Sequence, residues 1–129
     1  MKAFLTSVFV LFTIVSFSQE KPCNQLPVTP DVKASFDVAL KDSIENKLPE
    51  RLDVKGTETA SFKLQVTCEG EVKYCIYESG DMGEDYQKVV IAEASTIAWI
   101  GGKKEGKSVT SNLYIECTID IGVVSVRVL

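Results

Sequence analysis

Two pairs of acidic side chains are candidates for acid–base catalysis by carboxylates. Glu69 and Glu71 flank a glycine, and Glu84 is followed directly by Asp85. Two carboxylates act as acid and base only when their environments separate their pKa values. The first pair falls in a predicted turn and the second at a predicted helix start, where unpaired amides favour acidic residues. We therefore expect structural roles for both pairs and no catalytic residue.

The composition excludes most other kinds of catalytic site. Histidine is absent from the 129 residues, which excludes Ser-His-Asp sites, Cys-His sites and His-ligated metal sites. The segment Gly101-Gly102-Lys103-Lys104 lacks the spacing of a phosphate-binding loop and leads into a predicted strand, so we expect a flexible, charged loop. The net charge of −4 argues against a nucleic-acid partner. The sequence predicts no enzyme, no cofactor and no metal site.

Cysteines are the remaining candidates for covalent chemistry. Their spacing contains no Cys-x-x-Cys pair, which argues against a metal site. An even number of cysteines in an exported chain predicts structural disulfides, and four cysteines allow three pairings. The candidate disulfide cysteines are Cys23, Cys68, Cys75 and Cys117.

The N-terminus has the features of a secretory signal peptide. Lys2 supplies one positive charge, residues 3–17 form an apolar core, and Ser16 and Ser18 occupy the −3 and −1 positions of a cleavage site. The apolar run is shorter than the ~20 residues that span a bilayer. We expect cleavage after Ser18, a periplasmic or secreted location, and no membrane span in the mature chain. Residues 19–30 then form a tether with three prolines, and residues 31–129 form one domain.

Helical periodicity in the domain is followed by strand periodicity. A first helix is predicted from Thr29 until Pro49, which disfavours helical geometry before it. Two strands are predicted at 62–66 and 72–76, joined by a turn in which Gly70 is left-handed and Thr67 faces Glu71. In that register the apolar residues of both strands lie on the same side of the sheet. The apolar stripe of the helix consists of Phe36, Leu40, Ile44 and Leu48.

The second half of the domain again shows helical periodicity followed by strand periodicity. Asp81 and Glu84 have the spacing of a capping box, which predicts the start of a second helix. Alternation then predicts a long strand from Leu113 to Ile119 and, after Gly122, a last strand at 124–128. The apolar positions of the second helix are Tyr86, Val89 or Val90, Ala94 and Ile97. The order α-β-β-α-β, with the last strand added, predicts an α+β fold with two helices on one face of a three- to four-stranded, mostly antiparallel sheet.

Five short segments carry a resemblance to a known family. They are Leu48-Pro49 at a helix end, Gly56 before the strand 59–66, the turn Glu69-Gly70-Glu71-Val72, Ala98-Trp99 after a helix, and Gly106-Lys107-Ser108-Val109 before the last strand. In this order, from about residue 31 to residue 120, they resemble the C-terminal domain of TonB, especially its small free-standing relatives in the envelope of gram-negative bacteria. Two family prolines are absent, one after Trp99 and one near Glu116 in the last strand. Trp99 is expected to pack in the core.

The resemblance implies a module that binds a protein or peptide partner, such as an outer-membrane receptor or another envelope protein. The family pairs a peptide strand with the exposed edge of its last strand, which is β-augmentation. The valine-rich segment 123–129 could fold back through Gly122 and protect that edge. The corresponding candidate partner-binding edge in this chain is Asn112, Leu113, Tyr114, Ile115 and Glu116.

Family topology also restricts the disulfides, because it places the strand 62–66 between the other two strands. Cys68 and Cys117 would lie at opposite ends of the sheet, and a whole strand would separate Cys75 from Cys117. Both separations exceed the ~7 Å between the Cα atoms of bonded cysteines, so Cys23 is the expected member of any bridge.

The tether limits the function that the resemblance implies. About a dozen residues at ~3.5 Å each reach only about 40 Å, which argues against the transmission of energy between two membranes. The main hypothesis is therefore an exported, non-catalytic interaction module. The alternative is a small secreted α+β inhibitor or ligand-binding protein.

Overall fold

A computed structural model describes residues 26–51 and 56–129 of the chain. The predicted signal peptide 1–18, the first part of the tether and Cys23 lie outside these residues. The main sheet has the strand order β3-β2-β7-β8, and all its neighbouring strands are antiparallel. The elements are β1 (Ser35–Phe36), α2 (Ala39–Lys47), β2 (Thr57–Val66), β3 (Val72–Gly80), α3 (Glu84–Thr96), β4 (Trp99–Ile100), β5 (Gly102–Lys104), β6 (Lys107–Val109), β7 (Ser111–Asp120) and β8 (Val123–Val128).

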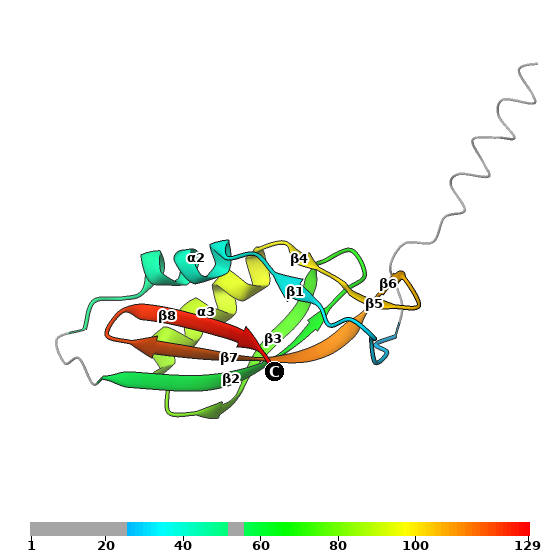
Figure 1. The fold of residues 1–129 in the computed structure, drawn as a ribbon. Helices are drawn as coiled ribbons and strands as arrows, with labels where there is room; N and C mark the ends of the chain where they lie inside the picture. Colours follow the sequence, from blue (N-terminus) through cyan, green and yellow to red (C-terminus); the bar gives the residue numbers. More distant parts are fainter. Residues whose placement is uncertain (1–25, 52–55) are drawn as a thin grey trace, which may run out of the picture.

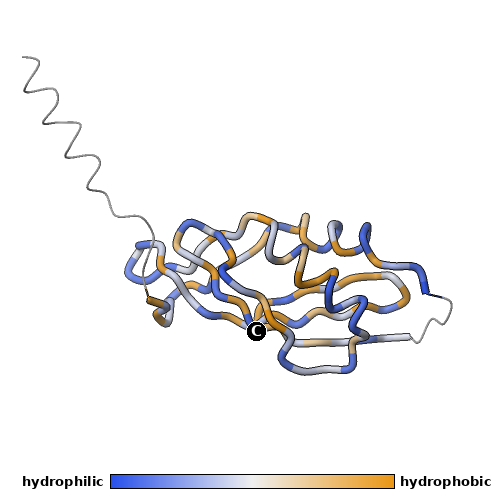
Figure 2. The backbone as a smooth tube through the Cα atoms, turned by 180° about the vertical axis from the view of Figure 1, so that it is seen from behind, coloured by the Kyte–Doolittle hydropathy of each residue, from blue (hydrophilic) through white to orange (hydrophobic). Residues whose placement is uncertain are grey.

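Both helices cover the same face of this sheet, with α2 over β8 and α3 over β3 (Figure 1). This arrangement confirms the predicted α+β class. Side chains alternate between the core and the solvent along β2 and β7, and hydrophobic and hydrophilic residues alternate accordingly along the backbone in Figure 2. The largest fully buried side chains include Phe62, Leu40, Ile44, Leu64 and Ile115.

The first helix begins at Ala39, so the prediction of a helix from Thr29 was wrong. The chain before Ala39 is extended because its backbone pairs with distant segments: Val32 bridges Lys103, and Phe36 pairs with Trp99. Phe36 still contacts the core, through an edge-to-face contact with Trp99 at 5.2 Å between ring centroids. The described part of the tether, residues 26–30, is also attached to the domain, because Val28 N donates to Thr110 O at 2.9 Å.

The turn between β2 and β3 is the predicted one. Gly70 has a φ of +84°, and Thr67 N donates to Glu71 O at 2.8 Å. The turn also packs on the segment after α3, because Trp99 N donates to Gly70 O at 3.0 Å. Trp99 is 5% exposed and its Nε1 donates to Ala94 O, which confirms its predicted place in the core.

The prediction that the apolar residues of β2 and β3 share one face was wrong. Val66 lies opposite Val72, but Gln65 lies opposite Tyr74, so β3 contains one extra residue between them. A single inserted residue moves the following side chains to the other face of a strand. Tyr74 and Ile76 therefore lie on the outer face, and Cys75 takes the core position opposite Leu64.

The second helix is confirmed over Glu84–Thr96, but its predicted capping box does not form. The residue before the helix is Gly83, and no side chain caps the helix start. Asp81 instead accepts a hydrogen bond from Thr59 N at 2.8 Å, which joins the chain after β3 to β2.

The segment predicted to be a flexible loop, 101–106, is an ordered hairpin of β5 and β6. Glu105 and Gly106 both have positive φ values, +52° and +78°, which is the geometry of a two-residue type I′ turn. This hairpin lies at one end of the molecule, beside the N-terminal segment (Figure 1).

The expectation that all four cysteines pair was wrong for two of them. Cys75 and Cys117 are free and buried. They lie on β3 and β7, on either side of β2, so two strand spacings of about 5 Å each separate them even before their offset along the strands is counted. Burial raises the pKa of each thiol to about 12. Cys68 is disulfide-bonded, and the expected bridge member Cys23 lies outside the described residues.

Thiol titration checks this cysteine assignment. We expect the native, non-reduced protein to resist an aromatic disulfide reagent at pH 8, because the two free thiols are buried and protonated there. Denaturation without reductant should release two reactive thiols per chain, and reduction should release all four. Four reactive thiols before reduction would contradict the bridge at Cys68.

Candidate functional site: an open stretch of sheet edge

The main sheet has two outer strands, β3 and β8, and β3 is unsuited to pairing. Two irregularities in its register with β2 leave Lys73 and Glu78 as extra residues without a partner in β2. Bulges and charged residues on an edge strand oppose the addition of another strand. The edge formed by β7 and β8 is therefore the better candidate for partner binding.

β8 covers one part of the predicted β7 edge. A turn at Ile121 and Gly122, with φ values of +47° and +79°, reverses the chain and pairs residues 123–128 with Asp120–Ile115. Of the predicted edge residues, Ile115 lies opposite Val128 and Glu116 lies opposite Arg127. The segment after Gly122 thus protects this half of the edge, as hypothesised.

The other half of the predicted edge is open at Asn112. Thr110 O accepts a hydrogen bond from Val28 N, and Tyr114 O accepts one from Leu129 N, both at 2.9 Å. Backbone groups alternate in direction along a strand, so Asn112 N–H and C=O point to the same side as these two carbonyls. Within residues 26–51 and 56–129, neither group has a partner there. Val28 and Leu129 therefore flank a gap of about 13 Å along β7, four residues at ~3.3 Å each.

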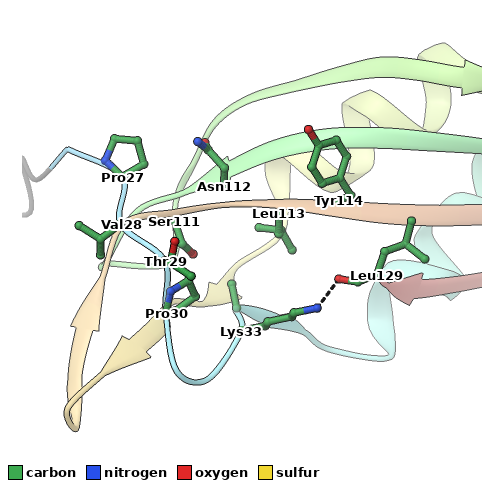
Figure 3. Close-up of a pocket in the computed structure, with 11 residues that line it drawn as sticks. Pro27, Val28, Thr29, Pro30, Lys33, Ser111, Asn112, Leu113, Tyr114 and Leu129 are labelled. Atoms are coloured by element: carbon green, nitrogen blue, oxygen red, sulfur yellow. Dashed lines mark hydrogen bonds between the residues drawn. The ribbon is translucent and has the colours of Figure 1, made fainter.

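A groove with a volume of about 350 Å³ lies along this gap. In Figure 3, Asn112 and Tyr114 point to one side of β7 and Ser111 and Leu113 to the other. Lys33 donates to Leu129 O at 2.6 Å and links the N-terminal segment to the end of β8. The groove is lined by Pro27, Val28, Thr29, Pro30, Lys33, Ala34, Ser111, Asn112, Leu113, Tyr114 and Leu129.

Ser111 is a functional candidate that sequence reasoning missed. Its Oγ is buried and is without a hydrogen-bond partner in the described part of the chain. Buried hydroxyls nearly always have a partner, so this atom stands out chemically. The sequence carries no signal for it, because its burial depends on how β5 packs: a Cβ added at Gly102 would lie 2.9 Å from Ser111 Oγ.

The side chain of Asn112 is held on the outer face of the sheet. Its Oδ1 accepts hydrogen bonds from Gln65 Nε2 at 3.1 Å and from Tyr74 Oη at 2.9 Å. These contacts fix the rotamer of Asn112 and leave the strand edge clear. The side chain of Asn112 is thus tied to β2 through Gln65 and to β3 through Tyr74.

The acidic pairs considered for catalysis lie elsewhere. Glu69 and Glu71 are exposed in the hairpin turn. Asp85, at the start of α3, accepts a hydrogen bond from Arg51 Nε at 2.9 Å, and this guanidinium holds the pKa of Asp85 below its usual range. Arg51 also bonds Glu58 and lies 3.4 Å from the ring centroid of Tyr86. Asp85 therefore belongs to a structural ion-pair network.

Comparisons with family models, with curated proteins and with solved structures found no match. Among the described residues, no group of three or more potential ligands is arranged to hold a metal ion. The helices in this part of the chain are also too short and too polar to cross a membrane.

Proposed function

We propose that the protein is an exported, non-catalytic interaction module, resembling the C-terminal domain of TonB, that binds an extended segment of an envelope protein by strand addition at Asn112. The observation that carries the proposal is the gap between Val28 and Leu129. There the sheet presents a backbone donor and acceptor without a partner among the described residues.

The rest of the sheet supports the same position. Bulges disturb β3, and β8 covers β7 from residue 115 onward. An incoming strand can therefore pair with Asn112 without displacing β8 or the segment at Val28. Only two or three residues of the partner pair there, so we expect weak, reversible binding that depends on the groove beside the edge.

A proline at position 112 tests this function. Asn112→Pro removes the outward N–H, whereas Asn112→Ala removes the side-chain contacts and keeps the N–H. We expect the wild type and Asn112→Ala to retain an outer-membrane receptor segment from envelope extract, and Asn112→Pro to lose it at least tenfold. Mass spectrometry identifies the retained proteins.

Two results would contradict the proposal. Equal retention by Asn112→Pro and Asn112→Ala would show that the partner does not pair with β7. Retention of a protease or a soluble ligand in place of an envelope receptor would favour the alternative function, a secreted inhibitor or ligand-binding protein.

A further inference from the structure

We propose that the side chain of Asn112 selects the partner residue opposite it, and that this residue carries a carboxamide, as asparagine and glutamine do. The inference rests on the proposed function, strand addition at Asn112, and adds the chemistry of the bound segment. It follows from the hydrogen bonds that orient the Asn112 amide and from the exposure of this side chain on the outer face of the sheet.

Three polar side chains form a row across the sheet that ends at the open edge. Gln65 on β2 lies opposite Tyr74 on β3 and opposite Asn112 on β7. Gln65 Nε2 donates to Asn112 Oδ1 at 3.1 Å, and Tyr74 Oη donates to the same oxygen at 2.9 Å. Gln65 and Asn112 thus form an amide–amide pair between neighbouring strands, the unit from which ladders of amide side chains are built.

These hydrogen bonds leave the nitrogen of the Asn112 amide available. Both donors reach its oxygen from the side of β2 and β3, and the oxygen and nitrogen of a carboxamide diverge from the same carbon. Asn112 Nδ2 is therefore turned away from β2, toward the open edge. It carries two N–H donors, and neither has a partner within residues 26–51 and 56–129. Because Asn112 is exposed, an incoming strand reaches this nitrogen without moving the fold.

Strand addition places one partner residue beside this amide. β8 runs antiparallel to β7, and its last backbone hydrogen bond joins Leu129 N to Tyr114 O. A segment that continues the line of β8 places its second residue directly opposite Asn112. Directly opposed residues on antiparallel strands share a face, with Cβ atoms about 4.5–5.5 Å apart. The side chain of that residue therefore lies on the outer face, to which Asn112 and Tyr114 point (Figure 3).

A carboxamide suits this position better than an acidic or an apolar side chain. Its oxygen accepts from Asn112 Nδ2, which extends the row by one amide in the same direction as the bond from Gln65 to Asn112. A carboxylate also accepts hydrogen bonds, but the net charge of −4 opposes an acidic segment. Leucine has nearly the shape of asparagine and offers no acceptor, so it leaves the facing amide donors unpaired.

Two synthetic peptides test this selectivity on the full mature chain, labelled with ¹⁵N and observed by NMR. N-acetyl-Ala-Asn-Ala-amide and N-acetyl-Ala-Leu-Ala-amide are titrated into the millimolar range against the wild type and Asn112→Ala, which keeps the backbone N–H. We expect both peptides to shift the backbone amide of residue 112 in both proteins. The ratio of the asparagine peptide's affinity to the leucine peptide's affinity should be about threefold higher for the wild type, the effect of one cross-strand hydrogen bond.

Comparing this ratio between the two proteins removes the difference in strand propensity between the peptides. Asn112→Ala is expected to fold, because the side chain that it shortens is exposed. The same ratio in both proteins would overturn the inference while leaving strand addition intact. Absence of any response at residue 112 to both peptides would also overturn it. The proposed function fails separately, if Asn112→Pro retains the partner.

Discussion

Gly70→Ala should lower the free energy of unfolding by about 3 kcal/mol, because the added Cβ strains the left-handed backbone and clashes with a packed neighbour. Gly70 has a φ of +84°, and a Cβ at this position would lie 2.0 Å from the carbonyl oxygen of Trp99. That oxygen belongs to backbone, which is itself held by the hydrogen bond from Trp99 N to Gly70 O. The β2–β3 turn and β4 would have to separate. Urea denaturation of the variant measures the loss.

Gly106→Ala is the matched control for this prediction. Gly106 has a similar φ of +78°, but a Cβ there meets nothing within 4 Å. Gly106→Ala should lower the free energy of unfolding by only about 1 kcal/mol, the cost of a left-handed alanine. Equal losses in the two variants would show that the turn at Gly70 does not pack on Trp99.

Arg51→Ala should destabilise the protein by about 3 kcal/mol, because it leaves a buried carboxylate without its cation. Glu58 is 8% exposed and is bonded by Arg51 and by Gly83 N. The substitution also removes the contact of the guanidinium with the ring of Tyr86 and both of its bonds to Asp85. The chain before β2 would then lose its attachment to the start of α3. Thermal and urea unfolding measure the change.

Arg127→Ala serves as the comparison on an exposed ion pair. Arg127 bonds Glu116, but its side chain is 67% exposed. Such pairs contribute less than about 1 kcal/mol. Equal losses in the free energy of unfolding for Arg51→Ala and Arg127→Ala would contradict the Arg51 network. Adding Glu58→Gln to Arg51→Ala should recover part of the stability lost in Arg51→Ala.

Alternation and turn chemistry were sufficient to predict the long strands of the main sheet and the turn between β2 and β3. The strands around Phe62 and Ile115 carry a regular period of two over ten residues each, and Gly70 marks the turn between β2 and β3. The fold class and the order of the main elements follow from these features. Hydrophobic periodicity over long segments is a strong signal because burial of one face depends on it.

Local pattern failed where backbone pairing between segments decided the conformation. Phe36 falls at helical spacing from Leu40, yet it pairs with Trp99 from an extended segment. The extra residue Lys73 in β3 reverses the faces of Tyr74 and Ile76, and nothing in the alternation of β3 marks the position of the insertion. The first error concerns residues far apart in the chain, whereas the second concerns a bulge in a hairpin whose paired residues, Gln65 and Tyr74, are only nine positions apart.

The candidate site was predicted in part. The edge residues from Asn112 to Glu116 were named, and the segment after Gly122 was expected to cover them. Which residues remain open depends on where β8 ends and where Val28 reaches β7, and these positions emerge only from the packed structure. The same is true of Ser111, whose importance rests on what surrounds it.

Native-state amide hydrogen exchange tests the central claim most directly, because it reports on each backbone N–H of β7 separately. In the free protein we predict fast exchange at Asn112 and slow exchange at Glu116 and Thr118, which pair with β8. A bound strand should then slow exchange at Asn112 alone. Protection of Asn112 equal to that of Glu116 in the free protein would contradict an open strand-pairing position on β7.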